Sequence, residues 1–135
     1  MARILVVDDD PLFLTIMNRV LEKAHHEVVT AADGAKAIAL FLGGNFDCLV
    51  CDLVLPNPSG LQVIREARHH APQTAIIAIS GGKSQGRSVH LDVLNMAQTV
   101  GANAVIKKPF VLSEFVATVE RALGAGAEKT AVSGG

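Results

Sequence analysis

Short apolar segments alternate with helix-like segments five times along this chain, and this alternation limits the fold more than any other feature. The apolar segments are strand-sized, and apolar residues at spacings of three and four follow each of them, as on one face of a helix. Repeated strand–helix units favour one parallel sheet with helices on both faces and right-handed crossovers. We therefore expect an α/β fold of the (βα)5 type, a doubly wound parallel sheet of five strands. The predicted strands are 4–7, 27–31, 48–52, 75–79 and 103–107.

Turn-forming and capping residues delimit the helices between these strands. Pro11 suits the first turn of a helix, and the Asp33–Gly34 pair suits the start of the next one. Gly101 is placed to end the fourth helix, because glycine closes helices readily. Residues 124–135 are mostly small and have little to bury, so we expect a folded domain at 1–123 followed by a disordered tail. The predicted helices are 11–24, 34–43, 61–67, 89–100 and 112–123.

Composition agrees with a small helix-covered sheet and excludes several classes of protein. With 135 residues the chain is long enough for one core and too short for a second full module. Half of the residues are apolar and Trp and Tyr are absent, which suits a core of Val, Ile, Leu and Ala. A net charge of −1 gives no general attraction to nucleic acid or to an anionic membrane. No apolar segment approaches the roughly 20 residues of a membrane span, so we expect a cytoplasmic protein without membrane contact.

Two patterns look like familiar motifs but do not support them. Cys48 and Cys51 form a C-x-x-C pattern, yet positions i and i+3 of a strand point to opposite faces of the sheet. Both cysteines are therefore expected to be buried as small hydrophobic residues and to share neither a metal nor a disulfide. The Gly82–Ser84 segment suggests a nucleotide-binding P-loop, but the first glycine of that motif would fall at Ile77.

Polar residues stand at the ends of four of the predicted strands. Asp8 and Asp9 follow the first strand and Asp52 ends the third. Ser80 follows the fourth strand and Lys108 follows the fifth. The carboxyl ends of parallel strands meet at one edge of the sheet, where the ligands of such folds bind. We therefore expect three carboxylates, a hydroxyl and an amine to converge there.

Carboxylates gathered at such an edge repel one another by about 4 kcal/mol per close pair at an effective dielectric constant near 20. A divalent cation removes this conflict, and Mg²⁺ suits one or two carboxylates, several waters and a phosphate. Asp52 could then attack phosphorus and form an aspartyl phosphate, while Lys108 and Ser80 contact phosphoryl oxygens. The ordinary alternative is a set of acids that cap the first helix, as Asp10 is expected to do, with a solvated lysine and a turn-capping serine.

Five short motifs, or anchors, occur along the chain in the same order as in the receiver domain of two-component response regulators. The chain resembles this family over residues 3 to about 123. The resemblance implies a flavodoxin-like sheet with the strand order 2-1-3-4-5. It also implies that Asp52 accepts a phosphoryl group from a sensor histidine kinase or a histidine phosphotransfer protein. The anchors are Asp8–Asp9, Asp52 with the L-P-x-x-x-G run Leu55–Gly60, Ser80, Gly101–Ala102, and Lys108–Pro109–Phe110.

The resemblance further implies roles for the other residues of the pattern. Asp9, Asp52 and the backbone carbonyl of Val54 would bind Mg²⁺ or Mn²⁺ directly, and Asp8 would act largely through water. Lys108, the residue immediately before the proline, would sense the phosphoryl group together with Ser80. Phosphorylation would then shift the population of the face formed by the fourth helix, fifth strand and fifth helix, and so control binding to a downstream protein target or a phosphorelay. The implied protein is a stand-alone signalling protein and not an enzyme, with homodimer formation left open.

The chain departs from the family pattern on the side that would transmit the signal. Val105 stands where the family usually has a switch aromatic, three residues before the lysine, so the usual change of an aromatic rotamer cannot occur. The segment after Ser80 is several residues longer than usual, and the excess at 81–88 is rich in glycine and basic residues. We hypothesise that this segment replaces the aromatic as the element that reports phosphorylation.

Two other functions fit part of the pattern. A haloacid-dehalogenase-like phosphatase also uses a strand-end Asp, Mg²⁺ and a lysine. Such enzymes commonly carry a second Asp two residues after the nucleophile, where this chain has Val54, and usually need a cap or a longer chain to enclose a substrate. The other alternative is a phosphorylation-independent pseudo-receiver, although such modules typically lose part of the acid cluster.

Overall fold

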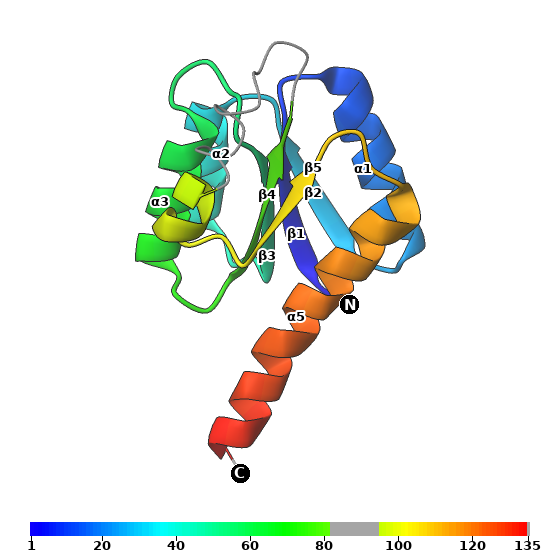
Figure 1. Ribbon diagram of the computed structural model, residues 1–135, viewed down its shortest axis with the longest axis vertical. Coiled ribbons are helices and arrows are strands. Elements are labelled where there is room, and N and C mark those ends of the chain that lie inside the picture. The colour runs from blue at the N-terminus through cyan, green and yellow to red at the C-terminus, as the bar shows by residue number, and fades with distance from the viewer. Residues whose placement is uncertain (82–94, 135) are drawn as a thin grey trace.

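The computed structural model contains a parallel sheet of five strands in the predicted order, β2-β1-β3-β4-β5 (Figure 1). The structure describes residues 1–81 and 95–134, with side chains up to residue 124. The chain order reverses between β1 and β3, which makes the carboxyl ends of these two strands the expected ligand edge. The strands are β1 (Arg3–Val7), β2 (Glu27–Ala31), β3 (Cys48–Asp52), β4 (Ala75–Ser80) and β5 (Ala104–Lys107).

Helices cover both faces of the sheet: α1 and α5 pack on one face, and α2 and α3 pack on the other (Figure 1). Residues 95–100 are also helical and belong to the predicted fourth helix. The remainder of that helix and most of the 81–88 segment fall in 82–94, outside the described residues. The helices are α1 (Pro11–Lys23), α2 (Gly34–Gly43), α3 (Gly60–His70) and α5 (Leu112–Gly134).

The helix α5 is longer than the sequence predicts, because it runs to Gly134 where the prediction places its end near Leu123. The added residues include several alanines, a glutamate and a lysine, which favour helix, and no proline interrupts them. The division into a domain at 1–123 and a tail at 124–135 stays a prediction. Within the part of the chain that the structure describes, no helix combines the length and hydropathy needed to cross a bilayer.

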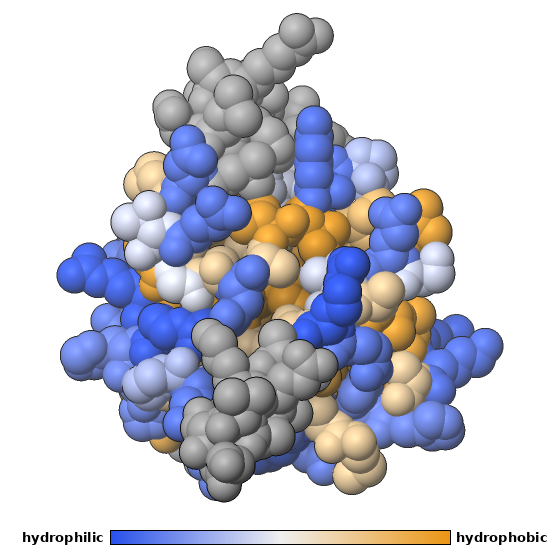
Figure 2. Space-filling model, turned by 60° about the horizontal axis from the view of Figure 1, so that its bottom comes forward, coloured by the Kyte–Doolittle hydropathy of each residue, from blue (hydrophilic) through white to orange (hydrophobic). Residues whose placement is uncertain are grey.

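The core is aliphatic and is divided into two layers, one on each face of the sheet. Successive residues of the central strands alternate between the layers, so Leu5 and Leu49 pack with α2 and α3. Ile4 and Val50 pack with α1 and α5. All four side chains are fully buried, which is typical of a parallel sheet covered on both faces. Hydrophobic residues still reach the surface between polar ones, as on the face that Figure 2 shows.

The two cysteines are free and buried, and they lie in opposite layers, as predicted. Burial, with the nearby charge of Asp47, raises the pKa of Cys48 to about 12. Burial likewise raises the pKa of Cys51 far above its usual range. Both thiols therefore stay protonated near neutral pH and behave as small hydrophobic side chains.

The start of α1 is tied to the end of β1 through Asp10, which is the predicted helix cap. Its carboxylate accepts a hydrogen bond from the N–H of Leu12 at 3.0 Å, and Pro11 occupies the first turn. The N–H of Asp10 itself donates to Oδ1 of Asp8 at 2.8 Å. The first turn of α1 is therefore fixed relative to the acids at the sheet edge. Asp33 caps α2 in the same way.

Candidate functional site

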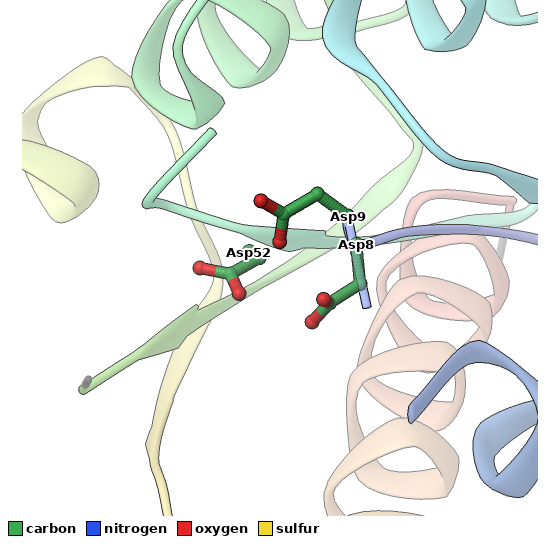
Figure 3. Close-up of side chains that lie close together, drawn as sticks. All are labelled: Asp8, Asp9 and Asp52. Carbon is green, nitrogen blue, oxygen red and sulfur yellow. The ribbon is translucent and has the colours of Figure 1, made fainter. Parts of the chain in front are cut away.

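Three aspartates converge at the carboxyl edge of the sheet. Asp8 follows β1 and Asp52 ends β3, and these neighbouring strands pair in parallel with Val7 opposite Cys51. One carboxylate oxygen from each of Asp8, Asp9 and Asp52 lies within 4.8 Å of the others. Figure 3 shows the three carboxylates gathered around a common space. Asp8 and Asp52 are buried, whereas Asp9 is exposed, so the cluster has two inner acids and one at the surface.

Lys108 lies between the two buried carboxylates. Its Nζ donates hydrogen bonds to Oδ2 of Asp8 at 3.1 Å and to Oδ2 of Asp52 at 3.0 Å. Its backbone N–H donates to the carbonyl of Ser80 at 2.7 Å, so the end of β4 fixes where the lysine leaves the sheet. The peptide bond between Lys108 and Pro109 is cis. Because its side chain is only 26% exposed and contacts two acids, the alternative interpretation of a solvated strand-end lysine is wrong.

Ser80 is the last residue of β4 and is fully buried at the same edge. Asp52 pairs with Ile79, the residue before it, which places Ser80 one position further toward the carboxyl end. The structure therefore brings the serine to the edge at which the acids and the lysine meet. Its contact with a phosphoryl group stays a prediction.

Val54 contributes its backbone to the site. Its N–H donates to Oδ1 of Asp52 at 2.8 Å, so both oxygens of Asp52 accept a hydrogen bond, one from Val54 and the other from Lys108. Val54 is 47% exposed, and its side chain offers neither an acid nor a base. The role of its carbonyl as a metal ligand stays a prediction.

Asp52 and Lys108 have shifted pKa values. The pKa of Asp52 is raised from 3.8 to about 6, chiefly because burial penalises the charged carboxylate, and the charge of Asp8 acts in the same direction. The N–H of Val54 and the Lys108 ammonium oppose this shift of the Asp52 pKa. Burial alone would lower the pKa of Lys108, but its hydrogen bonds and charge interactions with Asp52 and Asp8 raise it overall.

The acidic cluster fits a divalent cation. Its ligand atoms are carboxylate oxygens close enough together to share one ion, and oxygen ligands of this kind are those that Mg²⁺ and Mn²⁺ prefer. Asp52 is buried and its ionisation is costly, so a bound cation would stabilise the charged form of its carboxylate. Asp8, Asp9 and Asp52 could therefore hold Mg²⁺ or Mn²⁺.

Ionised Asp52 is expected to destabilise the metal-free protein. The unfolded carboxyl has a pKa of about 3.9, so the folded state binds this proton more tightly and loses stability as the pH rises from about 4 to about 6. At pH 7 in EDTA, Asp52→Asn is expected to raise the free energy of unfolding by about 1–2 kcal/mol. Urea unfolding at pH 7 and at pH 4 measures this difference, which should disappear at the lower pH. Equal stability of the two proteins at pH 7 would contradict the raised pKa.

The strand order and the edge pocket define a flavodoxin-like α/β protein whose ligand site lies at the switch point of its sheet. The chain belongs to the response regulator receiver domain family, which matches residues 4–120. Receiver domains of two-component systems are signalling modules rather than classical enzymes. Phosphorylation and Mg²⁺ binding at an acidic pocket are general features of this family. The resemblance identified in the sequence is thereby confirmed.

Similar proteins include two transcriptional regulators and a receiver domain of known structure. TcrA, a transcriptional regulatory protein of Mycobacterium tuberculosis, is 35% identical over 117 residues, which cover 86% of this chain and 44% of TcrA. The DNA-binding transcriptional regulator NtrC of Azospirillum brasilense is 31% identical over 131 residues, 97% of this chain and 26% of NtrC. The chain thus spans less than half of each regulator. A CheY-like receiver domain protein of Methanospirillum hungatei is 26% identical, with a TM-score of 0.87 and coverage of 96% of this chain and 98% of that chain.

One contact at the site was not predicted from the sequence. The ring of Phe13, near the start of α1, lies 4.2 Å from the Nζ of Lys108, measured to the ring centroid. The helical spacing of Phe13 predicts only an ordinary core residue. The contact was missed because periodicity cannot distinguish a side chain that only faces the core from one that also contacts a charged group. Its place a few residues after the Asp8–Asp9 pair was the one available signal.

Proposed function

We propose that this chain is a phosphoacceptor that takes a phosphoryl group on Asp52 from a sensor histidine kinase or a histidine phosphotransfer protein. The observation that carries this proposal is the setting of Asp52. It is a buried carboxylate, held through both oxygens by Val54 and Lys108, beside two further acids that could share a divalent cation with it.

Asp52 is the nucleophile in the proposed reaction. One of its oxygens forms a bond to phosphorus while the bond from phosphorus to the donor's imidazole nitrogen breaks, and the imidazole leaves with the electron pair. Mg²⁺ or Mn²⁺ held by Asp8, Asp9, Asp52 and the Val54 carbonyl would screen the negative charges of the carboxylates and the phosphoryl group. The N–H of Val54 orients the carboxylate through its 2.8 Å hydrogen bond to Oδ1.

Lys108 and Ser80 are the proposed contacts of the phosphoryl oxygens. The Lys108 ammonium already lies 3.0 Å from Asp52, so it can balance charge that arrives on that carboxylate without a large movement. Ser80 offers a buried hydroxyl from the neighbouring strand, one position beyond Asp52 along the edge. Together they would bind a phosphorylated Asp52 more tightly than the free carboxylate, which is the condition for a population shift.

The proposed output is a change in protein–protein binding or onward transfer of phosphate in a relay. The curated relatives are transcriptional regulators of more than twice the matched length. We propose that the unit described here contacts a kinase or phosphotransfer protein and a downstream protein, rather than nucleic acid, because its net charge of −1 gives no basic surface excess. A stand-alone protein that acts in this way, with or without a homodimer, is the simplest version of the proposal.

Val105 sets this chain apart on the output side. It lies on β5 opposite Ala78 and is half-buried against the layer of α2 and α3. A valine has no ring to turn between an outer and an inner position, so the usual aromatic switch is not available. We retain the hypothesis that the 81–88 segment reports phosphorylation instead, and its residues from 82 onward lie outside those that the structure describes.

Incubation with acetyl phosphate and Mg²⁺ separates the proposed function from its two rivals. We expect stable labelling that resists acid, is lost in base and is prevented by EDTA. Rapid turnover of phosphate esters without accumulated label would indicate a phosphatase. The chain does not favour that outcome, because the exposed Val54 stands where such enzymes carry their general acid. No labelling by acetyl phosphate or by any histidine kinase of the source organism would indicate a pseudo-receiver.

A further inference from the structure

The Lys108 ammonium has a third neighbour besides Asp8 and Asp52. Its Nζ lies 4.2 Å from the centroid of the Phe13 ring, well inside the range of a cation–π contact. Nζ also lies 3.1 Å from the carboxylate of Asp8 and 3.0 Å from that of Asp52. The ammonium is therefore bounded by two carboxylates and an aromatic ring, and the ring is uncharged and competes for no proton.

The Phe13 ring is held in place from two directions. On its own helix, Asp10 caps the first turn of α1 and donates its N–H to Asp8, which fixes the start of the helix against the site. From the loop before α5, Phe110 meets Phe13 edge to face, with ring centroids 5.9 Å apart and planes at 79°. Aromatic pairs favour this geometry, so any other orientation of the Phe13 ring would lose a favourable contact with Phe110.

The row of aromatic rings continues into the core. Phe110 stacks on Phe115 with centroids 5.6 Å apart and planes at 29°. Phe115 belongs to α5 and is fully buried in the layer between the sheet and the helices α1 and α5. A continuous row of contacts therefore runs from the buried face of α5 through Phe110 and Phe13 to the Lys108 ammonium.

We propose that Phe13 is a positioning residue that holds the Lys108 ammonium over the carboxylate pair. This inference rests on the proposed function. An ammonium that is already fixed beside Asp52 can stabilise the negative charge of an incoming phosphoryl group without first having to move. A leucine at position 13 would fill similar space and pack on the same neighbours, but it would offer no ring face to the ammonium. Phe13 acts through Lys108 and does not itself touch the reacting atoms.

Phosphoryl transfer rates with acetyl phosphate and saturating Mg²⁺ test this role. Phe13→Leu is expected to lower the maximum labelling rate about five-fold, as the loss of a partly buried cation–π contact implies. Phe13→Tyr keeps the ring face and is expected to restore the rate. In a Lys108→Met background, Phe13→Leu should cause no further loss, because there is no ammonium left to position. An equal loss in both backgrounds would assign Phe13 a structural role and overturn the proposal.

Phe46→Leu is a matched control. Phe46 also lies under a cation, with the Arg3 guanidinium 4.6 Å from its ring centroid, but it precedes β3 at the end of the strand away from Asp52. This variant removes the same kind of contact and is expected to leave the labelling rate unchanged. A rate loss as large as that of Phe13→Leu would show that any lost aromatic contact slows the reaction, which would contradict the specific role of Phe13.

NMR of the Lys108 side chain separates a failure of this inference from a failure of the proposed function. The methylene protons next to Nζ should be shifted upfield by the Phe13 ring current in the wild type and in Phe13→Tyr, and not in Phe13→Leu. If the wild type shows this shift but takes no label, the positioning contact exists and the phosphoacceptor function is wrong. If Lys108 shows ordinary shifts in the wild type, the contact is absent and the positioning role of Phe13 is wrong, whatever the labelling shows.

Discussion

Replacement of Asp52 by asparagine is expected to abolish phosphoryl labelling of this protein. The amide has nearly the size of the carboxylate, and its oxygen can still accept the hydrogen bond from the N–H of Val54, so the fold around position 52 should persist. An amide oxygen is, however, too weak a nucleophile to attack phosphorus and carries no charge to share with a cation. Labelling with acetyl phosphate and Mg²⁺, followed by gel autoradiography or intact mass, measures the loss.

Asp10→Asn is the matched control for this variant. Asp10 is next to the acidic cluster in the chain but caps α1, a role for which asparagine is as suitable as aspartate. The control is therefore expected to label as the wild type does. Residual labelling of Asp52→Asn at the wild-type level would move the acceptor to another residue and contradict the assignment.

Gly60→Ala is expected to cost more than about 3 kcal/mol of stability. A Cβ at position 60 would lie 2.0 Å from the carbonyl oxygen of Asp52 and 2.5 Å from the Cα of Leu53, and both of these are backbone atoms that cannot swing away. The first turn of α3 thus packs directly on the chain that carries the acceptor. A methyl group there must push α3 or Asp52 out of position, so labelling should fall together with stability.

Gly43→Ala provides the comparison for that loss. Gly43 ends α2, and a Cβ there would meet no atom within 4 Å. Alanine at this position should leave stability unchanged or raise it by up to about 1 kcal/mol, through its better helix propensity. Urea unfolding of both variants decides the matter: similar free energies of unfolding for Gly60→Ala and Gly43→Ala would show that the close approach at Gly60 does not exist in solution.

The fold was predictable because its determinants are local and repeated. Four of the five strands contain a continuous apolar run, whereas β2 includes Glu27 and Thr30 and has a weaker pattern. Alternation of such runs with helical spacing leaves few topologies other than a doubly wound sheet. The convergence of Asp8, Asp52 and Lys108 was predictable for a related reason, since parallel strands place their carboxyl ends at one edge. That the lysine bridges the two buried acids, instead of facing solvent, required the structure, because strand position sets where a side chain starts and not where its flexible end goes.

The contacts that escaped prediction depend on tertiary packing. Phe13 has the spacing of a core residue, and its approach to Lys108 follows from how α1 and the loop before α5 lie against each other. The continuation of α5 to Gly134 was missed because the tail was predicted from the lack of large apolar residues to bury. Helix propensity was the better guide there, since the alanines of this segment favour a helix. On the output side, the structure places Val105 on β5 opposite Ala78, and the hypothesis about its effect on signalling stays a prediction.

Identification of the modified residue tests the central claim most directly. After incubation with acetyl phosphate and Mg²⁺, borohydride reduces an acyl phosphate to the alcohol, and the reduced aspartate can then be located by peptide mass spectrometry. We predict that reduction converts Asp52, and neither Asp8 nor Asp9, to homoserine. Modification at Asp8 or Asp9, or no reduced aspartate in a protein that binds Mg²⁺, would contradict the account of Asp52 as the phosphoacceptor.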